Sequence, residues 1–477
     1  MSRRPPIPVR NPRTGRADHA IVPLDAAEVA AAAQRLRAVQ PGWDALGPDG
    51  RAEVLRSFGA AISGRRAALQ AALETDTGRR GVTALEIDSV LRMIARWAER
   101  APALIAGVAV ADAQTAMPGV TFGIVPEPVP LVGVISPWNF PLLLALTDAI
   151  PALAAGCAVL VKPSEVTPRF IAPLMEAVDA VGGLPLLLVE GDGETGAALV
   201  STVDFICFTG SVATGRKVGE AAARAFIPAS LELGGKDPMI VLESADPAWA
   251  ARVAVSASCR ATGQACQSIE RIYVADAIFA PFVDALVAEA EAVTLDHPEM
   301  GDGDLGPFIF AAQARIVADQ IADAVGKGAR IRAGGTVETL GGGLYMTPTV
   351  LTDVTHEMAV MRQETFGPVM PVMRFADAEE AIRLANDSDY GLSAAVLAGT
   401  VAEAEAVAVR LHAGAISLND GALTALVSDA EKSAWKLSGL GPSRMGASGI
   451  TRFLKRRAML RQTGDALPLA AFSGRRA

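Results

Sequence analysis

The amino-acid sequence predicts an α/β protein with two α/β domains and a small β arm. Short apolar runs rich in β-branched residues alternate with alanine-rich helical stretches, first from about Val129 to Leu242 and again from near Asp237 to about Leu423. This alternation is typical of βαβ units built on a parallel sheet. Between residues 118 and 130, prolines separated by β-branched residues indicate a protruding hairpin or an arm.

The first alternating series has clear punctuation. We expect strands in the runs LVGVI, AVLV and LLLV, and helices at residues 142–155 and 171–181. Gly156 lies where the first of these helices should stop. Thr167 and Pro168, just ahead of the second of these helices, resemble an N-cap followed by proline at the first helical position.

The second series predicts three further helices, at residues 247–262, 277–293 and 311–326. A chain of 477 residues exceeds what one hydrophobic core usually supports, so at least two domains are expected. No internal repeat interrupts this pattern.

Composition narrows the class of protein. The apolar residues, 51% of the chain, never form an uninterrupted run long enough to span a bilayer, and the N-terminus lacks the apolar stretch of a secretory signal. Four cysteines are too few for a disulfide framework, so free thiols and a cytoplasmic location are expected. A net charge of −9 disfavours nucleic-acid binding, and the four histidines lack metal-ligand spacing, so no metal site is predicted.

Two polar loops follow neighbouring strands of the first series, SPWNFP at residues 136–141 and KPSE at residues 162–165. Because ligands in open α/β sheets bind at the carboxyl ends of strands, Trp138, Asn139 and Lys162 are well placed for a site. Glu165 could accept both ribose hydroxyls of adenosine and would repel a 2′-phosphate, which favours NAD over NADP. Taken alone, the first loop is better explained as a turn with a buried tryptophan. A surface ion pair is the alternative for the second loop, and it becomes less attractive because the preceding loop points to the same edge of the sheet.

Two glycine patterns have phosphate-binding spacing. The segment from Gly191 to Gly196 matches G-x-G-x-x-G only partly, because no acidic residue clearly ends a second strand at the expected distance. The segment from Gly210 to Gly215 follows a strand and opens a helix, where backbone N–H groups can receive phosphate. It also suggests a P-loop NTPase, but Arg and Lys stand where Lys and then Ser or Thr are required. Contact with a pyrophosphate is therefore ranked first.

Glu232 and Cys266 are the candidate base and nucleophile. Glu232 stands between leucines before two glycines, and apolar surroundings can bring a carboxyl group towards general-base strength. Pairing with Lys236 at a strand end is the alternative. Cys266 follows a helical run at a loop, where a thiol can be exposed, whereas the apolar surroundings of Cys157 and Cys207 are typical of the core. Local chemistry does not rank Cys266 above Cys259.

Taken together, these segments resemble the aldehyde dehydrogenase superfamily in residues, order and spacing. The resemblance rests on SPWNFP, KPSE, FTGSVATG, LELGGK, GQAC with Arg271 five residues on, and ETFGP. It extends from Asn11-Pro12 through Asn386 and the YGL segment to the KLSG segment that begins at Lys436. Each segment is weak alone, but the ordered set is very specific.

The resemblance implies roles for individual residues. Cys266 would be the nucleophile, Glu232 the base that activates water, and the Asn139 amide with the backbone N–H of Cys266 the oxyanion hole. Lys162 and Glu165 would bind the adenosine ribose, Gly210 and Ser211 the pyrophosphate, and Glu364 and Phe366 the nicotinamide ribose. The full expected NAD site comprises Ile135, Ser136, Trp138, Lys162, Ser164, Glu165, Gly193, Gly210, Ser211, Glu364 and Phe366.

The implied reaction is NAD-dependent oxidation of an aldehyde to the acid through a cysteine thiohemiacetal and a thioester. Members that transfer the acyl group to coenzyme A or reduce acyl phosphates commonly lack the glutamate, so Glu232 favours a free acid as product. The implied architecture is a Rossmann-like NAD-binding domain (1–117 and 131–236), a catalytic domain (237–425), and an oligomerisation arm with a C-terminal segment (118–130 and 426–477). A homodimer or homotetramer is expected.

The sequence also departs from the family pattern. Cys259, Arg260 and Ala261 replace the usual Phe-x-Asn, and the common C-terminal glutamate is missing from the segment that leads to Arg444. The apolar character of residues 419–426 favours a hydrophobic aldehyde, aliphatic or aromatic. A P-loop-type NTPase and a catalytically silent structural relative remain the alternatives.

Overall fold

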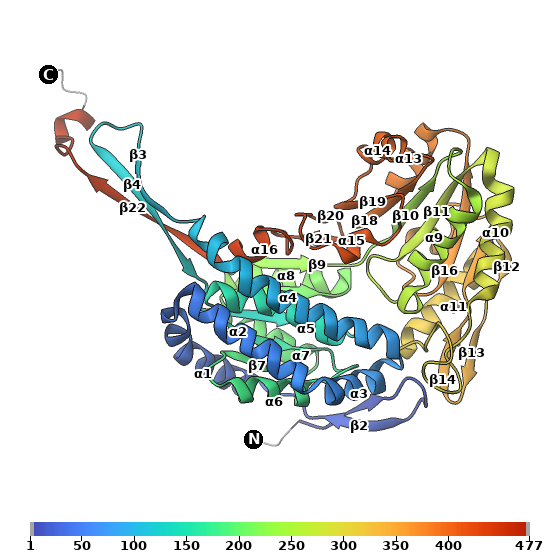
Figure 1. Cartoon of the computed structure of the whole chain (residues 1–477), viewed down its shortest axis with the longest axis horizontal. Coiled ribbons are helices and arrows are strands. Elements are labelled where there is room, and N and C mark those ends of the chain that lie inside the picture. The colour runs from blue at the N-terminus through green and yellow to red at the C-terminus, as the bar shows by residue number, and fades with distance from the viewer. Residues whose placement is uncertain (1–3, 474–477) are drawn as a thin grey trace.

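The computed structural model describes residues 4–473. Residues 1–3 of the expected segment 1–117 and residues 474–477 of the expected segment 426–477 lie outside the described residues. Two sheets, each flanked by helices, and a protruding three-stranded arm make up the molecule (Figure 1). The mixed α/β fold predicted from the alternating pattern is confirmed. The boundaries of the domains stay a prediction.

The first sheet has six strands in the order β21-β9-β8-β5-β6-β7. All pairs are parallel except β21, which pairs antiparallel with β9. The strands are β5 (Leu131–Ile135), β6 (Ala158–Lys162), β7 (Leu186–Leu188), β8 (Phe205–Thr209), β9 (Ala229–Glu232) and β21 (Gly439–Leu440). The C-terminal segment therefore contributes a strand to this sheet.

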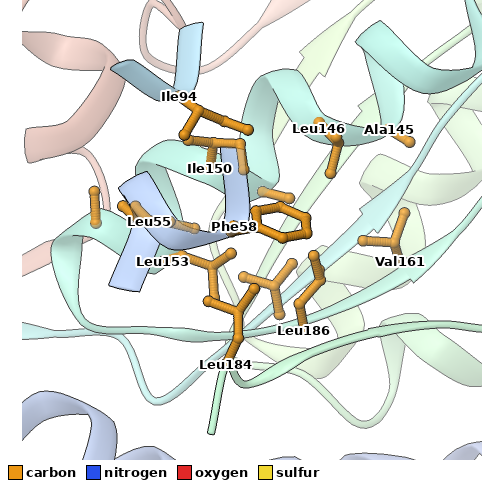
Figure 2. Packing of buried hydrophobic residues seen from close by; sticks show 14 of the residues in the cluster. Leu55, Phe58, Ile94, Ala145, Leu146, Ile150, Leu153, Val161, Leu184 and Leu186 are labelled. Carbon is orange, nitrogen blue, oxygen red and sulfur yellow. The ribbon is translucent and has the colours of Figure 1, made fainter. Parts of the chain in front are cut away.

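Helices cover both faces of the first sheet, because its buried strands alternate apolar side chains between the faces. They are α1 (Ala26–Ala45), α2 (Gly47–Gly64), α3 (Arg66–Thr77), α4 (Arg80–Ala106), α5 (Pro141–Ala155), α6 (Ile171–Val181), α7 (Gly193–Val200) and α8 (Val212–Ala225). Val132 and Val134 pack with α2, α4, α5 and α6, whereas Leu131 and Ile135 pack with α1, α7 and α8. Figure 2 shows Phe58 of α2 within the first of these cores.

The second sheet has seven strands in the order β12-β15-β16-β11-β10-β18-β19, with only β12 antiparallel to its neighbour. They are β10 (Asp237–Val241), β11 (Ile269–Ala275), β12 (Arg330–Ala333), β15 (Thr349–Thr352), β16 (Val369–Phe375), β18 (Ser393–Leu397) and β19 (Ala415–Leu418). Its helices are α9 (Pro247–Cys259), α10 (Phe279–Ala292), α11 (Ala311–Gly326), α12 (Ala359–Arg362), α13 (Ala378–Asn386), α14 (Val401–Ala408) and α15 (Leu423–Leu426). The cluster with α9 and α10 lies on one face, and the cluster with α11 to α14 on the other.

The region expected to protrude forms an arm of three antiparallel strands. It comprises β3 (Val110–Gln114), β4 (Val120–Pro128) and β22 (Leu454–Gln462), with β4 in the middle (Figure 1). β3 lies before the expected arm range of 118–130. It belongs to the arm because it pairs antiparallel with β4. The remaining elements are β1 (Ile7–Arg10), β2 (Ala17–Ile21), β13 (Val337–Leu340), β14 (Gly343–Met346), β17 (Tyr390–Gly391), β20 (Trp435–Lys436) and α16 (Ser448–Thr451).

One predicted cap and one predicted helix end were wrong. α6 spans Ile171–Val181 as expected, but Thr167 does not cap it and instead donates a hydrogen bond to the Trp138 carbonyl at 3.2 Å. α9 ends at Cys259, because Ala261 and Thr262 have φ of 54° and 62°, in the left-handed region where a right-handed helix cannot continue. Both differences lie next to predicted site residues.

Candidate active site

The LELGGK segment, residues 231–236, links the last parallel strand of the first sheet to β10 of the second. A Cβ on Gly234 would lie 2.5 Å from Oε1 of Glu364, and a Cβ on Gly235 would lie 2.8 Å from the carbonyl oxygen of Cys266. The Gly235 N–H donates to Glu364 at 3.1 Å. The two glycines therefore allow Glu364 and the Cys266 loop to approach the strand that carries Glu232.

Cys266 differs from the other three cysteines in its surroundings. Cys157, Cys207 and Cys259 are buried in hydrophobic cores, whereas Cys266 is half-buried. Burial, followed by the nearby charge of Glu232, raises the pKa of Cys266 to about 12, while burial alone raises that of Cys259 to about 12. The tertiary structure thus separates two cysteines that local chemistry could not rank. At neutral pH the Cys266 thiol is protonated and needs a base for attack.

Asn139 lies against the loop that carries Cys266. Its buried side-chain amide donates a hydrogen bond to the Gln264 carbonyl at 3.0 Å. Gln264 is itself held, because its side chain accepts from Ile309 N at 2.9 Å and donates to the Pro307 carbonyl at 3.3 Å. An amide nitrogen carries two hydrogens, so one N–H of Asn139 stays available to a ligand near the thiol.

Arg79 is a residue that the sequence analysis missed. Its buried guanidinium donates to the backbone carbonyl of Asn139 and, at 3.3 Å, to that of Ala261. It therefore ties the SPWNFP loop to the segment preceding Cys266. Burial lowers the pKa of Arg79 to about 10, so the group stays charged at neutral pH. Arg79 lies between two helices in no recognisable motif, so no sequence signal could have identified it.

The predicted cofactor residues of β5 and β6 lie at one rim of the first sheet. Ser136 N donates to the Lys162 carbonyl at 3.2 Å, and the Lys162 ammonium contacts the Glu165 carboxylate at 3.2 Å. Lys162 is buried and Glu165 is 38% exposed at its side chain, so the carboxylate faces solvent and can be reached by a ligand. Ser164 accepts a hydrogen bond from Val166 N at 3.2 Å, which closes this turn.

Both glycine-rich turns begin helices, with different caps. At α8, Ser211 accepts from Thr214 N at 3.3 Å, and Gly210 N donates to the Glu232 carbonyl at 3.1 Å, so this turn adjoins the candidate base. At α7, the Asp192 carboxylate accepts from the backbone N–H groups of residues 194 and 195. The N-terminus of α7 therefore already holds an anion, beside the predicted contact Gly193.

The ETFGP segment is held by a buried ion pair. Glu270 accepts from the Lys236 ammonium at 2.9 Å, from Thr365 N at 2.8 Å and from Phe366 N at 2.7 Å. The Phe366 ring packs edge-on against Trp138 at 5.5 Å between centroids, which joins this segment to the first sheet's loop. Burial, followed by the charge of Glu270, raises the pKa of Glu364 to about 8.

Two cations stand near Glu232. The Nε of Arg444 lies 3.9 Å from Oε2 of Glu232, and the side chain of Arg444 is only 5% exposed. The Lys432 ammonium donates to the Thr424 carbonyl at 2.7 Å; burial lowers the pKa of Lys432, while the neighbouring Glu232 and Cys266 oppose that effect. The sequence showed Arg444 as a departure without a role, and Lys432 lies in no motif.

The described residues, 4–473, include no helix that is both long and apolar enough to cross a membrane. Within the same range, no three His, Cys, Asp or Glu side chains are grouped so that they could hold a metal ion.

Comparisons with known proteins identify the family of this chain. The profile described as "Aldehyde dehydrogenase family" matches residues 1–459. A protein of Mycolicibacterium smegmatis named "Putative succinate-semialdehyde dehydrogenase (NADP(+))" is 38% identical, over 94% of this chain and 87% of its own. The 4,4'-diapolycopene aldehyde oxidase of Methylomonas sp is 40% identical, over 80% of this chain and 72% of its own. A solved structure titled "Putative Aldehyde Dehydrogenase PutA", from Anabaena variabilis, is 53% identical with a TM-score of 0.95, covering 97% and 99% of the two chains.

Proposed function

Because the chain belongs to the aldehyde dehydrogenase family and is an NAD(P)-dependent aldehyde dehydrogenase, we propose that it oxidises hydrophobic aldehydes to carboxylic acids with NAD. The observation that carries the proposal is the approach of the Cys266 loop, Asn139 and Glu232 at the LELGGK link. These residues supply a nucleophile, an oxyanion donor and a base. The P-loop NTPase alternative is set aside with the family assignment.

The proposed reaction assigns one step to each group. The Cys266 thiol gives its proton to water, its sulfur bonds to the aldehyde carbon, and the Asn139 amide with the Cys266 N–H stabilises the oxyanion of the thiohemiacetal. One such donor lowers the barrier by about 3–4 kcal/mol. NAD supplies the hydride acceptor when bound. Glu232 then takes a proton from the water that cleaves the thioester, which releases the acid.

The residues present fit a dinucleotide at the rim of the first sheet. Glu165 offers a solvent-facing carboxylate to a ribose, the N-terminus of α8 offers backbone N–H groups beside Ser211, and Trp138 contacts Phe366 at the far end. The preference for NAD over NADP rests on Glu165, whose charge opposes a 2′-phosphate even though Lys162 partly balances it. This proposal departs from the cofactor named for the Mycolicibacterium smegmatis relative.

The proposed hydrophobic substrate rests on α15 and the residue that follows it. Leu423, Leu426 and Val427 are 41%, 65% and 47% exposed, which is unusual for three neighbouring large apolar side chains. The Thr424 carbonyl of the same helix holds Lys432, a neighbour of Glu232 and Cys266, so α15 stands beside the reacting groups. The Methylomonas relative, whose name denotes a polyene aldehyde, supports the same class.

The proposed assembly is a homodimer or homotetramer formed through the arm, in the cytoplasm. β22 presents Met459 and Leu460, 46% and 73% exposed, on a sheet that projects from the body (Figure 1). An isolated three-stranded arm with exposed apolar side chains is stabilised when a second copy covers it. Four free cysteines fit a reducing compartment.

A panel of aldehydes tested with NAD and NADP examines the proposed function. Medium-chain aliphatic and aromatic aldehydes should give higher kcat/KM than succinic semialdehyde, measured by the absorbance of the reduced cofactor. Cys266→Ser should abolish the reaction, and Glu232→Gln should keep a burst of NADH but turn over slowly. Full activity in Cys266→Ser would refute the central assignment, and no activity towards any aldehyde would favour a catalytically silent relative.

A further inference from the structure

We propose that Arg444 is a positioning residue for Glu232, which holds the carboxylate in place for cleavage of the thioester. The inference rests on the proposed function and adds a residue to its last step. Arg444 stands in the C-terminal segment in which this sequence departs from the family pattern.

Two hydrogen bonds fix Arg444. Its Nη2 donates to Asp148 at 3.0 Å and to Thr209 Oγ1 at 2.7 Å. Arg452 binds the other oxygen of Asp148, and all three charged side chains are at most 5% exposed. A buried carboxylate between two guanidiniums therefore anchors Arg444 from α5. The anchor is built into the first sheet, since Thr209 ends β8.

A second nitrogen of Arg444, Nε, lies near Glu232. Nε is buried and has no hydrogen-bond partner, and it lies 3.9 Å from Oε2 of Glu232. The pairing of β21 with β9 sets Gly439 opposite Glu232, which brings the segment containing Arg444 against the base. A buried donor without a partner is costly, so the position of Nε next to one carboxylate indicates that Glu232 is the group with which it interacts.

The distance between Arg444 and Glu232 suits the role of Glu232 as a base better than the shorter distance of a hydrogen-bonded ion pair would. At 3.9 Å the guanidinium stabilises the charge of Glu232, but no direct hydrogen bond occupies the carboxylate oxygens. Glu232 can therefore accept a proton from water, whose oxygen then bonds to the thioester carbon. The C–S bond breaks, the acid leaves, and the Cys266 sulfur regains the proton from Glu232. Lys432 is a second cation near Glu232 and Cys266, so Arg444 and Lys432 both stabilise the charge that develops at these groups.

The test compares Arg444→Met and Arg444→Lys with the full-length enzyme in stopped flow. The burst of NADH should be unchanged in rate and amplitude, while steady-state turnover falls about tenfold in Arg444→Met. The variant should accumulate an acyl group on Cys266, detected by mass spectrometry after acid quench. Arg444→Lys, which keeps the charge, should lie between. Hydroxylamine, which cleaves thioesters without a base, should restore turnover.

Arg374→Met is the matched control, because Arg374 is an exposed arginine paired with Asp276 on the second sheet. It should leave both phases unchanged. Equal losses of burst and turnover in Arg444→Met, or unchanged turnover, would overturn the proposal. If both Arg444 variants failed to fold, the role of Arg444 would be structural only, and the proposal would also be refuted. A wild-type enzyme without any NADH burst would instead refute the proposed function.

Discussion

Glu270→Gln separates the charge of a buried pair from its shape. Glu270 accepts three hydrogen bonds, from Lys236, Thr365 and Phe366, and the Lys236 side chain is fully buried. Gln has nearly the same volume but leaves the ammonium without a counter-charge. Removal of one partner from a buried pair costs about 3–5 kcal/mol. Because the same carboxylate holds the ETFGP turn, affinity for NAD should fall together with the free energy of unfolding.

Urea unfolding followed by tryptophan fluorescence measures the first effect, and titration with NAD measures the second. The double variant Lys236→Met/Glu270→Leu is the matched comparison, because apolar residues of similar volume leave no unpaired charge. It should recover part of the lost stability but not the affinity for NAD, because the N–H groups of Thr365 and Phe366 lose their acceptor. A loss in Glu270→Gln below about 1 kcal/mol, the size of a surface pair, would refute the assigned role of the buried pair.

Three further predictions concern the cofactor, the nucleophile and the arm. Glu165→Ser should raise kcat/KM with NADP relative to NAD at least tenfold, because the charge opposing a 2′-phosphate is removed; an unchanged ratio from initial rates would contradict this role. With the pKa of Cys266 near 12, about 10⁻⁴ of the thiol is ionised at pH 8, so the alkylation rate by iodoacetamide without cofactor should rise about tenfold per pH unit from 7 to 10. If the labelling rate, measured by mass spectrometry, instead levels off above about pH 8.5, the thiol has an ordinary pKa. Leu460→Glu should dissociate the proposed homodimer or homotetramer, as measured by light scattering, whereas Phe226→Glu, at an exposed position outside the arm, should not.

Much of the fold followed from local patterns. Strand and helix alternation depends on the residues within each segment, so the predicted strands of the first sheet and helix 311–326 were confirmed. The cap suggested at Thr167 was wrong, because its side chain donates instead to the carbonyl of Trp138, 29 residues away in the chain. Local propensity is informative where no such distant contact competes with it.

The sequence alone determined the family, because ordered motifs such as LELGGK and GQAC need no knowledge of contacts. The resemblance selected Cys266, but only the tertiary structure showed how its surroundings differ from those of Cys259: Cys266 is half-buried and has the charged neighbour Glu232, whereas Cys259 is buried. The tertiary structure also revealed Arg79 and Arg444, which act through groups distant in the chain. The reason is physical: charge, burial and hydrogen bonding at a site depend on segments that meet only after folding, as β21 meets β9.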